Sequence, residues 1–328
     1  MISDGVLKEF NKKNVLVTGG SGLIGRQIVD LLADAGACIR SVSLDRIIVN
    51  ANVENIVGDL TNLEFCKEIA REMDYLFHLA GVQGTVQTSS SKLASHFVPT
   101  LMMNTNMLEA ARLSKVKKLV YTSSIGAYAE SAVLRESDYK IDSLPMSFAG
   151  WAKRMAELQI YSYRMQYGID TFSIVRLSNI YGPGDNFNPE TAMVIPSLMY
   201  RILKGDDPVV VWGDGTAVRD FLYSRDAAEG VVLTLHHGTA SDFVNIGSGK
   251  GISIWDIMIA LRSFINFNYT FDASKPSGAS MRVMDIAKAR ETLDFIPSTD
   301  ITTGLKNTWE WFVSHPGEHE NKMNYFLA

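Results

Sequence analysis

A glycine-rich turn directly after an apolar segment most constrains the fold of this 328-residue chain. Residues 15–18 read Val-Leu-Val-Thr, and residues 19–25 follow as Gly-Gly-Ser-Gly-Leu-Ile-Gly. This pattern predicts a buried strand that leads into an amphipathic helix over residues 22–35. The glycines would let the backbone bend tightly and approach a pyrophosphate, whose charge a helix N-terminus favours. An ordinary turn is the alternative, but the strand-turn-helix context favours a dinucleotide site.

Strand and helix signals alternate through the first half of the chain. After the first pair we expect strands at residues 37–44, 55–58, 74–80, 118–124 and 171–177, and helices at residues 62–72, 93–113 and 149–167. Such alternation predicts an α/β fold with a doubly wound, Rossmann-type parallel sheet. Beyond residue 182 the pattern loosens into short strands and helices. We therefore expect a dinucleotide-binding domain over residues 1–180 and a smaller, partly interleaved substrate-binding lobe over residues 181–328.

Charge and apolar content argue against several other classes of protein. The net charge is −5 and no basic block is present, which argues against a nucleic-acid-binding protein. No apolar run is long enough to span a bilayer, and the first 14 residues do not resemble a signal peptide. We predict that the two cysteines, Cys38 and Cys66, are buried reduced thiols, and no metal-ligand spacing occurs. The expectation is a cytoplasmic protein without a metal.

Polar residues after the later strands mark the rest of the expected cofactor site. The ribose 2′-hydroxyl of NAD usually meets an acid at the end of the second strand, but Ser43 occupies that place and Asp45 lies two residues on. The neighbouring Arg46 would tolerate NADP, but Asp45 favours NAD. The alternative is that Asp45 and Arg46 are solvated loop charges. Asp59 follows the third strand, within expected reach of the adenine amino group, and His78 ends the fourth as an expected structural histidine. The predicted cofactor-binding residues of these segments are Gly19, Ser21, Gly22, Leu23, Ile24, Gly25, Asp45, Asp59, Leu60, Leu79, Ala80 and Gly81.

One position departs from an expected pair of side chains. Residues four apart on a helix lie on the same face, so a tyrosine at position 149 would stand beside Lys153. The lysine ammonium would then favour the ionised phenol and so assist proton transfer. The chain has Ala149 instead, and the adjacent Phe148 points to another helix face and carries no hydroxyl.

Together the motifs resemble the extended short-chain dehydrogenase/reductases, which are the nucleotide-sugar epimerase and dehydratase family. The resemblance covers nearly the whole chain and rests on the glycine turn, Gly58-Asp59-Leu60, His78-Leu79-Ala80-Gly81, Tyr121-Thr122-Ser123-Ser124, Lys153-Arg154-Met155-Ala156-Glu157, residues 176–183, Arg219-Asp220-Phe221 and residues 245–249. It implies NAD as the cofactor and a nucleotide-diphosphate sugar as the substrate. Because homologous folds pair through the helices at residues 93–113 and 149–167, it also implies a homodimer or homotetramer.

The resemblance implies roles for individual residues. Ser124 matches the hydroxyl that binds the sugar's reacting oxygen, and Lys153 matches the lysine that binds the nicotinamide ribose. These two and the position of Ala149 form the expected catalytic set. The implied substrate-binding residues are Ser123, Asn179, Val194, Trp212, Arg219, Arg282 and Asp285. Arginines suit a diphosphate because guanidinium groups bind it bidentately. The alternatives are surface ion pairing for Arg219 and Arg282 and a core position for Trp212.

Three segments resemble the GDP-sugar branch of the family, which includes the GDP-fucose synthases: residues 184–187, 193–196 and 209–215. Within that branch the resemblance is closer to a GDP-manno-heptose 4-dehydrogenase of capsule or lipopolysaccharide assembly. Met193 stands where the synthases carry an epimerising histidine, and no cysteine follows Ser124. Ile125 stands where sugar 4,6-dehydratases carry an acid. The resemblance therefore implies hydride transfer alone, at C4 of the sugar. A UDP-sugar 4-epimerase is the alternative.

Three explanations for Ala149 stay open. The catalytic tyrosine was replaced by an engineer, or Ser124, a water or Lys153 moves the proton in a slow natural oxidoreductase, or the protein binds its ligands in a regulatory role without turnover. Loss of a positioned acid or base usually costs about 10²–10⁴ in rate. We favour an enzyme because Ser124, Lys153 and the expected diphosphate-binding residues are all retained.

Overall fold

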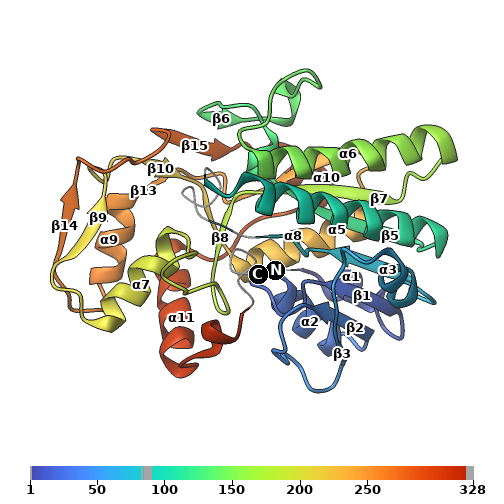
Figure 1. Ribbon diagram of the computed structural model, residues 1–328, viewed down its shortest axis with the longest axis horizontal. Helices are drawn as coiled ribbons and strands as arrows, with labels where there is room; N and C mark the ends of the chain where they lie inside the picture. The colour runs from blue at the N-terminus through green and yellow to red at the C-terminus, as the bar shows by residue number, and fades with distance from the viewer. Residues whose placement is uncertain (1, 83, 85–90, 323–328) are drawn as a thin grey trace.

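A parallel sheet of seven strands lies at the centre of the computed structural model, which describes residues 2–82, 84 and 91–322 (Figure 1). In spatial order the strands are β12 (Phe243–Ile246), β7 (Phe172–Leu177), β5 (Lys118–Ser124), β4 (Tyr75–His78), β1 (Asn14–Thr18), β2 (Cys38–Ser43) and β3 (Glu54–Val57). Every neighbouring pair is parallel. This sheet confirms the predicted Rossmann-type fold. The strand order reverses between β1 and β4, which places the ligand crevice at their carboxyl ends.

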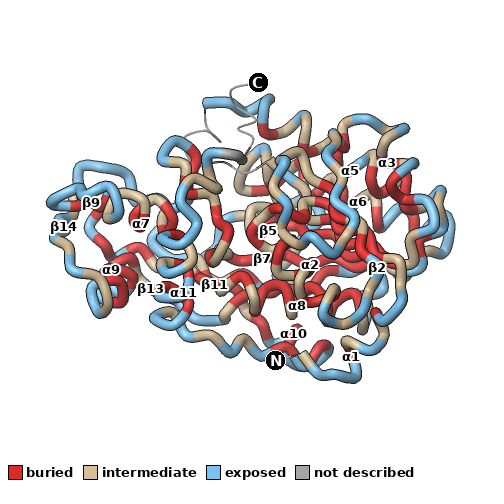
Figure 2. The backbone as a smooth tube through the Cα atoms, turned by 90° about the horizontal axis from the view of Figure 1, so that it is seen from below, coloured by how far each residue is buried: buried red, intermediate tan, exposed pale blue. Residues whose placement is uncertain are grey.

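Helices cover both faces of the sheet (Figure 1). On one face α5 (Leu93–Leu113) packs between α3 (Leu63–Ile69) and α6 (Phe148–Tyr167). On the other face α8 (Ser224–His237) contacts both α2 (Gly25–Asp34) and α10 (Ala287–Leu293). A short helix, α1 (Asp4–Lys8), precedes β1. Figure 2 shows that buried backbone runs through β5, β7 and α8. Helix α2 begins three residues later than predicted, because residues 19–24 form the turn itself.

The second lobe packs around a separate apolar core in which the rings of Phe187 and Phe312 stack at 3.9 Å. Its helices are α7 (Val194–Lys204), α9 (Ile254–Arg262) and α11 (Ile301–Ser314). Its paired strands are β8 (Asn179–Tyr181) with β11 (Phe221–Tyr223), β9 (Val209–Trp212) with β14 (Tyr269–Asp272), and the sheet β13 (Ile252–Ser253), β10 (Val218–Arg219), β15 (Met281–Met284) and β6 (Val133–Leu134). Short 3₁₀ helices are η1 (Ile125–Ala127), η2 (Glu136–Asp138) and η3 (Glu318–Asn321).

The two lobes exchange chain segments. Strand β12 and helices α8 and α10 follow residue 180 in sequence, yet their apolar side chains belong to the core of the first lobe. Conversely, β6 from the first half pairs with β15. The boundary at residue 180 stays a prediction.

Two smaller features complete the fold. None of the helices in the described part of the chain combines the length and apolar character needed to cross a membrane. Both cysteines are free, and Cys66 is buried as predicted, with burial raising the pKa of its thiol to about 12. Cys38 is exposed, so its predicted burial is wrong: it is the first residue of β2, at the rim of the sheet.

Candidate functional site

The glycine turn packs tightly against the end of β4. Gly19 has a φ of 74°, and a Cβ added to it would lie 2.9 Å from the Ala80 nitrogen. A Cβ on Gly25 would lie only 2.1 Å from the Gly19 oxygen, a distance that no side chain tolerates. The turn therefore needs glycine at both positions. It brings the predicted residues 19–25 and 79–81 together at the carboxyl ends of β1 and β4.

Asp45 lies beside this turn, just beyond β2. Its Oδ2 accepts a hydrogen bond of 2.9 Å from the Ser21 hydroxyl, and the Ser21 N–H donates to the Ser43 hydroxyl at 2.9 Å. A carboxylate is thus held at the edge of the turn where the ribose of a dinucleotide is expected. Asp59 is exposed and accepts from the Thr61 N–H, whereas Leu60 is buried.

The amine of Lys153 lies at the other end of the same crevice. Its Nζ donates to the Thr122 carbonyl at 2.8 Å and lies 5.2 Å from the centre of the Tyr121 ring. A Cβ built on Gly81 would stand 3.4 Å from Nζ, so the amine borders the segment that follows β4. Burial lowers the pKa of Lys153 to about 8, and the Glu157 carboxylate opposes that shift. The lysine is therefore close to losing its proton near neutral pH.

Ser124 and Ala149 lie where the end of β5 meets the start of α6. The Ser124 hydroxyl accepts from the Gly126 N–H at 2.9 Å. Gly150 packs directly on Gly126, because a Cβ on Gly150 would fall within 1.9 Å of the Gly126 oxygen. This contact holds the half-buried Ala149 near Ser124, and one helical turn places Lys153 on the same face. The structure thus brings the three predicted catalytic positions together.

Ser123 does not face this site, which corrects its predicted substrate contact. Its side chain is 2% exposed and its hydroxyl donates to Glu157 at 2.5 Å. Neighbouring residues on a strand point to opposite faces, so Ser123 points inward where Ser124 points outward. Glu157 is also bound by Arg176, whose guanidinium lies 3.7 Å from the centre of the Phe243 ring.

A second buried chain of polar contacts lies beneath Lys153. His78 binds the Thr18 hydroxyl through Nδ1 at 2.8 Å and the Asn104 amide oxygen through Nε2 at 3.1 Å. Asn104 in turn donates to the Tyr121 hydroxyl at 2.9 Å. Burial lowers the pKa of His78 to about 3, so the ring is neutral. The prediction of a structural histidine is confirmed.

Arg219 and Arg282 lie opposite each other on the paired strands β10 and β15. Arg219 donates to the carbonyls of Val218 and Ser277, at 2.8 and 3.1 Å, and forms no ion pair within the described part of the chain. Desolvation and the nearby Arg282 lower the pKa of Arg219. Arg282 lies 3.4 Å from Glu130, so the ion-pair alternative applies to Arg282 alone. Two guanidinium groups held together in this way favour an anionic ligand.

The remaining predicted substrate residues also lie on the second lobe. Asn179 begins β8 and its amide donates to the Asp220 carbonyl at 3.0 Å, while Val194 begins α7. Asp285 follows β15 and lies 3.4 Å from Arg135. Trp212 is 56% exposed, beneath the Lys275 amine at 5.9 Å, so the alternative of a core position is wrong.

Sequence reasoning missed two groups of residues. The first is Glu157 with its partners Ser123 and Arg176. Glu157 lies at helical spacing from Lys153, but its partners come from other strands and depend on tertiary contacts. Arg26, near the start of α2, donates to the Ser21 carbonyl at 3.3 Å and pairs with Glu318 at 2.5 Å. No local signal links residues so distant in sequence.

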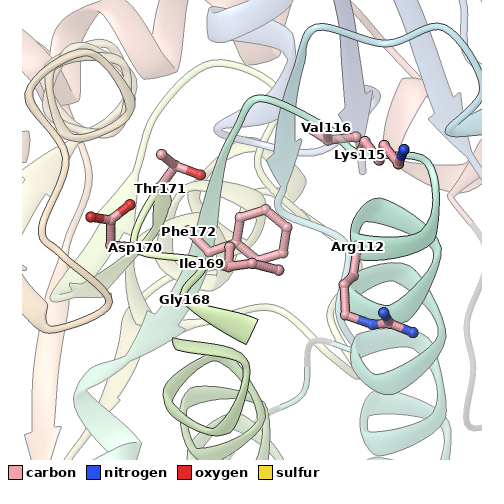
Figure 3. Close-up of a pocket in the computed structure, with 8 residues that line it drawn as sticks. All are labelled: Arg112, Lys115, Val116, Gly168, Ile169, Asp170, Thr171 and Phe172. Carbon is pink, nitrogen blue, oxygen red and sulfur yellow. The ribbon is translucent and has the colours of Figure 1, made fainter. Parts of the chain in front are cut away.

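A hollow of about 320 Å³ lies near the amino ends of β5 and β7 (Figure 3). Its lining side chains come from the end of α5 and the segment before β7, and they are Arg112, Lys115, Val116, Gly168, Ile169, Asp170, Thr171 and Phe172. These residues lie at the amino ends of β5 and β7, whereas Thr122 and Ser124 lie at the carboxyl end of β5. The hollow is therefore separate from the crevice.

The crevice fits a dinucleotide. The tight packing at Gly19 and Gly25 shapes the turn that begins α2, whose N-terminus favours phosphates. Asp45 suits a ribose, and Lys153 lies at the far end.

Comparison with known proteins supports this fit. Residues 15–247 match the NAD dependent epimerase/dehydratase family. The chain is 29% identical to a probable GDP-L-fucose synthase of Oryza sativa subsp. japonica, with 92% of each chain covered. It also resembles a solved UDP-glucose 4-epimerase from Thermotoga maritima, at 27% identity and a TM-score of 0.80, covering 92% of this chain and 99% of that one. A structure of MoeE5 with UDP-glucose and NAD matches at 26% identity and a TM-score of 0.77, covering 91% and 98%.

Proposed function

Because the chain belongs to the NAD-dependent epimerase/dehydratase family, we propose that it transfers hydride at C4 of a nucleotide-diphosphate sugar, with a GDP sugar preferred. Its cofactor is NAD. The observation that carries the proposal is the position of Lys153, whose amine binds the Thr122 carbonyl and borders Gly81. That amine and the Ser124 hydroxyl stand at one end of the crevice, where a sugar carbon and a nicotinamide ring would meet.

Each part of the crevice has its own task in this proposal. The turn at residues 19–25 binds the pyrophosphate and Asp45 binds the adenosine ribose. Lys153 binds the nicotinamide ribose, and Ser124 donates a hydrogen bond to the reacting sugar oxygen, since its own oxygen already accepts from Gly126. When bound, NAD supplies the hydride acceptor. The protein contributes orientation and the movement of the proton.

The second lobe binds the substrate's diphosphate and nucleoside. Arg219 and Arg282 are the proposed diphosphate ligands, because Arg219 lacks an acidic partner among the described residues. Asn179 and Asp285 flank them. The exposed ring of Trp212 offers a surface for the base. The likeness to a GDP-L-fucose synthase supports a GDP sugar, whose modified product would suit capsule or lipopolysaccharide assembly.

The proposed reaction is simpler than that of a GDP-fucose synthase. Met193, which caps α7 and is 43% exposed, has no group that exchanges protons. Ile125 is equally inert after Ser124. Neither epimerisation at C3 and C5 nor elimination therefore has its acid or base. A UDP-sugar 4-epimerase is the second candidate, supported by the likeness to the Thermotoga maritima enzyme.

The test is to incubate the protein and NAD with GDP-mannose, GDP-manno-heptose, UDP-glucose and UDP-galactose. The proposed oxidation predicts NADH absorbance at 340 nm with a GDP sugar and a keto-sugar product by mass spectrometry. Interconversion of UDP-glucose and UDP-galactose without net NADH would instead identify a 4-epimerase. Absence of both, in this protein and in its Ala149→Tyr variant, would contradict an enzymatic function. Calorimetric binding without turnover would then support a regulatory protein.

A further inference from the structure

We propose that Lys153 itself accepts and returns the proton that a phenol at position 149 would carry, a role that rests on the hydride-transfer function proposed above. The geometry of the amine carries this inference, together with the absence of a competing group among the described residues that face it.

Among the residues that the structure describes, the amine has one hydrogen-bond partner and forms no ion pair. Its hydrogen bond to the Thr122 carbonyl can be donated by a neutral amine as well as by an ammonium. The nearest carboxylate on its helix, Glu157, has both oxygens occupied: Oε1 by Ser123 and Arg176, and Oε2 by Arg176. No ion pair in the described part of the chain includes Lys153, so nothing there fixes it as an ammonium.

The amine also faces the place where the proton is released. It borders Gly81, which follows β4, and it binds Thr122 on β5, the strand that ends at Ser124. Alanine at position 149 ends at Cβ, so no ring stands beside the lysine on the same helix face. A sugar hydroxyl held by Ser124, or one water between the two, can therefore reach the Lys153 nitrogen.

The other titratable groups that face Lys153 do not suit the task. On β4, His78 has both ring nitrogens bonded and burial keeps it neutral. On β5, burial raises the pKa of Tyr121 well above its ordinary value, and its hydroxyl accepts from Asn104 on α5. On α6, Glu157 is held by Arg176, and Arg154 stays protonated. An aliphatic hydroxyl such as Ser124 does not ionise near neutral pH.

Lysine can serve because its proton affinity matches the working pH. Burial brings the pKa to about 8, which leaves about a tenth of the amines neutral at pH 7. In the step itself the O–H bond of the sugar breaks and its proton moves to the neutral Lys153 nitrogen. The C4–H bond breaks as its electron pair leaves with the hydrogen to NAD⁺, and the C4=O bond forms. The sugar is oxidised, NAD⁺ is reduced, and Lys153 becomes an ammonium.

The first test measures the proton affinity of Lys153 without cofactor or substrate. Lysine labelled with ¹³C at Cε is followed by NMR from pH 6 to 11, and the Lys153 signal is assigned by its loss in Lys153→Arg, or in Lys153→Gln if arginine does not fit. We expect a midpoint near 8 for the Lys153 signal. A Lys153 midpoint above 10 would overturn the proposal.

The second test is a double-mutant cycle with the best sugar from the panel above. Arginine keeps the positive charge but cannot release a proton, so Lys153→Arg should lower kcat by about 10²–10⁴ in the Ala149 protein. In the Ala149→Tyr protein the phenol supplies the missing acid and base, so the same change should cost less than about tenfold. Lys306→Met, on the exposed face of α11, is the control that should leave kcat unchanged.

The outcomes separate the two proposals. Turnover together with an equal loss from Lys153→Arg in both backgrounds would remove the role of Lys153 and leave the function standing. Turnover in neither background would remove the function and with it this role. Calorimetry with NAD checks that each variant still binds its cofactor.

Discussion

Arg176 binds Glu157 through two hydrogen bonds, Nε to Oε1 at 2.9 Å and Nη2 to Oε2 at 2.6 Å. Arg176 is fully buried and Glu157 is 6% exposed. The pair joins β7 to α6 beneath the catalytic end of the crevice, and Ser123 extends it to β5. The same helix carries Lys153 one turn earlier, so the pair holds α6, and with it the Lys153 amine, in position against the sheet.

Glu157→Gln should lower the free energy of unfolding by about 3 kcal/mol, because it leaves a buried guanidinium without its opposite charge. The variant should also lower the pKa of Lys153 further, since the Glu157 carboxylate raises it. Urea denaturation and the NMR titration of Lys153 measure the two effects. Glu54→Gln is the matched control, because its pair with Arg40 is half-exposed and should contribute little. Equal losses in the two variants would contradict a special role for the buried pair.

Local patterns predicted the fold and one half of the site. The strand that ends at Thr18 and the glycines after it identify the cofactor crevice, because their spacing alone dictates the turn. The hydrophobic pattern likewise located α6 and thus the face shared by Ala149 and Lys153. The tertiary partners of the site residues could not be predicted in this way. The sequence Ser123-Ser124 does not say which hydroxyl points outward, since that depends on how β5 pairs with its neighbours.

Asp45 should make the protein prefer NAD to NADP. Its carboxylate, held by Ser21, would accept from a ribose hydroxyl and repel a 2′-phosphate. We expect at least about tenfold tighter binding of NAD, and Asp45→Asn should reduce that ratio several-fold. Calorimetric dissociation constants for both cofactors provide the measurement. Asp59→Asn should weaken both cofactors alike and leave their ratio unchanged; a ratio that changes as much in this variant would contradict the assignment of Asp45.

The outer face of α5 and α6 should pair with a second copy of the chain. The two helices pack side by side, and their exposed apolar side chains repeat at helical spacing. They include Val98 and Met102 on α5 and Tyr161 and Met165 on α6. Light scattering after size exclusion should give a multiple of one chain's mass, and Met165→Glu should reduce it to a single chain. Ile296→Glu, an equally exposed apolar site elsewhere, should not. A monomer before mutation would contradict the proposed assembly.

The contribution of Asp185 to stability should fall as the pH rises from about 4 to 7. This carboxyl is 3% exposed, its Oδ2 has no hydrogen-bond partner among the described residues, and burial raises its pKa from 3.8 to about 7. A folded-state pKa above the unfolded value means that the folded protein binds the proton more tightly. Its stabilising effect is therefore complete below about pH 4 and is lost between pH 4 and 7.

Asp185→Asn should remove this dependence and make the protein more stable at pH 7.5 by about 2 kcal/mol, while changing little at pH 4. Lys322 donates to the Asp185 carbonyl at 3.2 Å, and burial lowers the pKa of that lysine to about 8. Its effect belongs to the range above pH 8, and the neutral His78 affects both proteins alike. The difference in urea midpoint between wild type and Asp185→Asn from pH 4 to 7.5 therefore isolates the aspartate. Asp272→Asn gives the opposite sign, since hydrogen bonds from Ser274 lower the pKa of that exposed carboxyl. A wild-type midpoint that rises between pH 5 and 7, and does so equally in Asp185→Asn, would contradict the raised pKa.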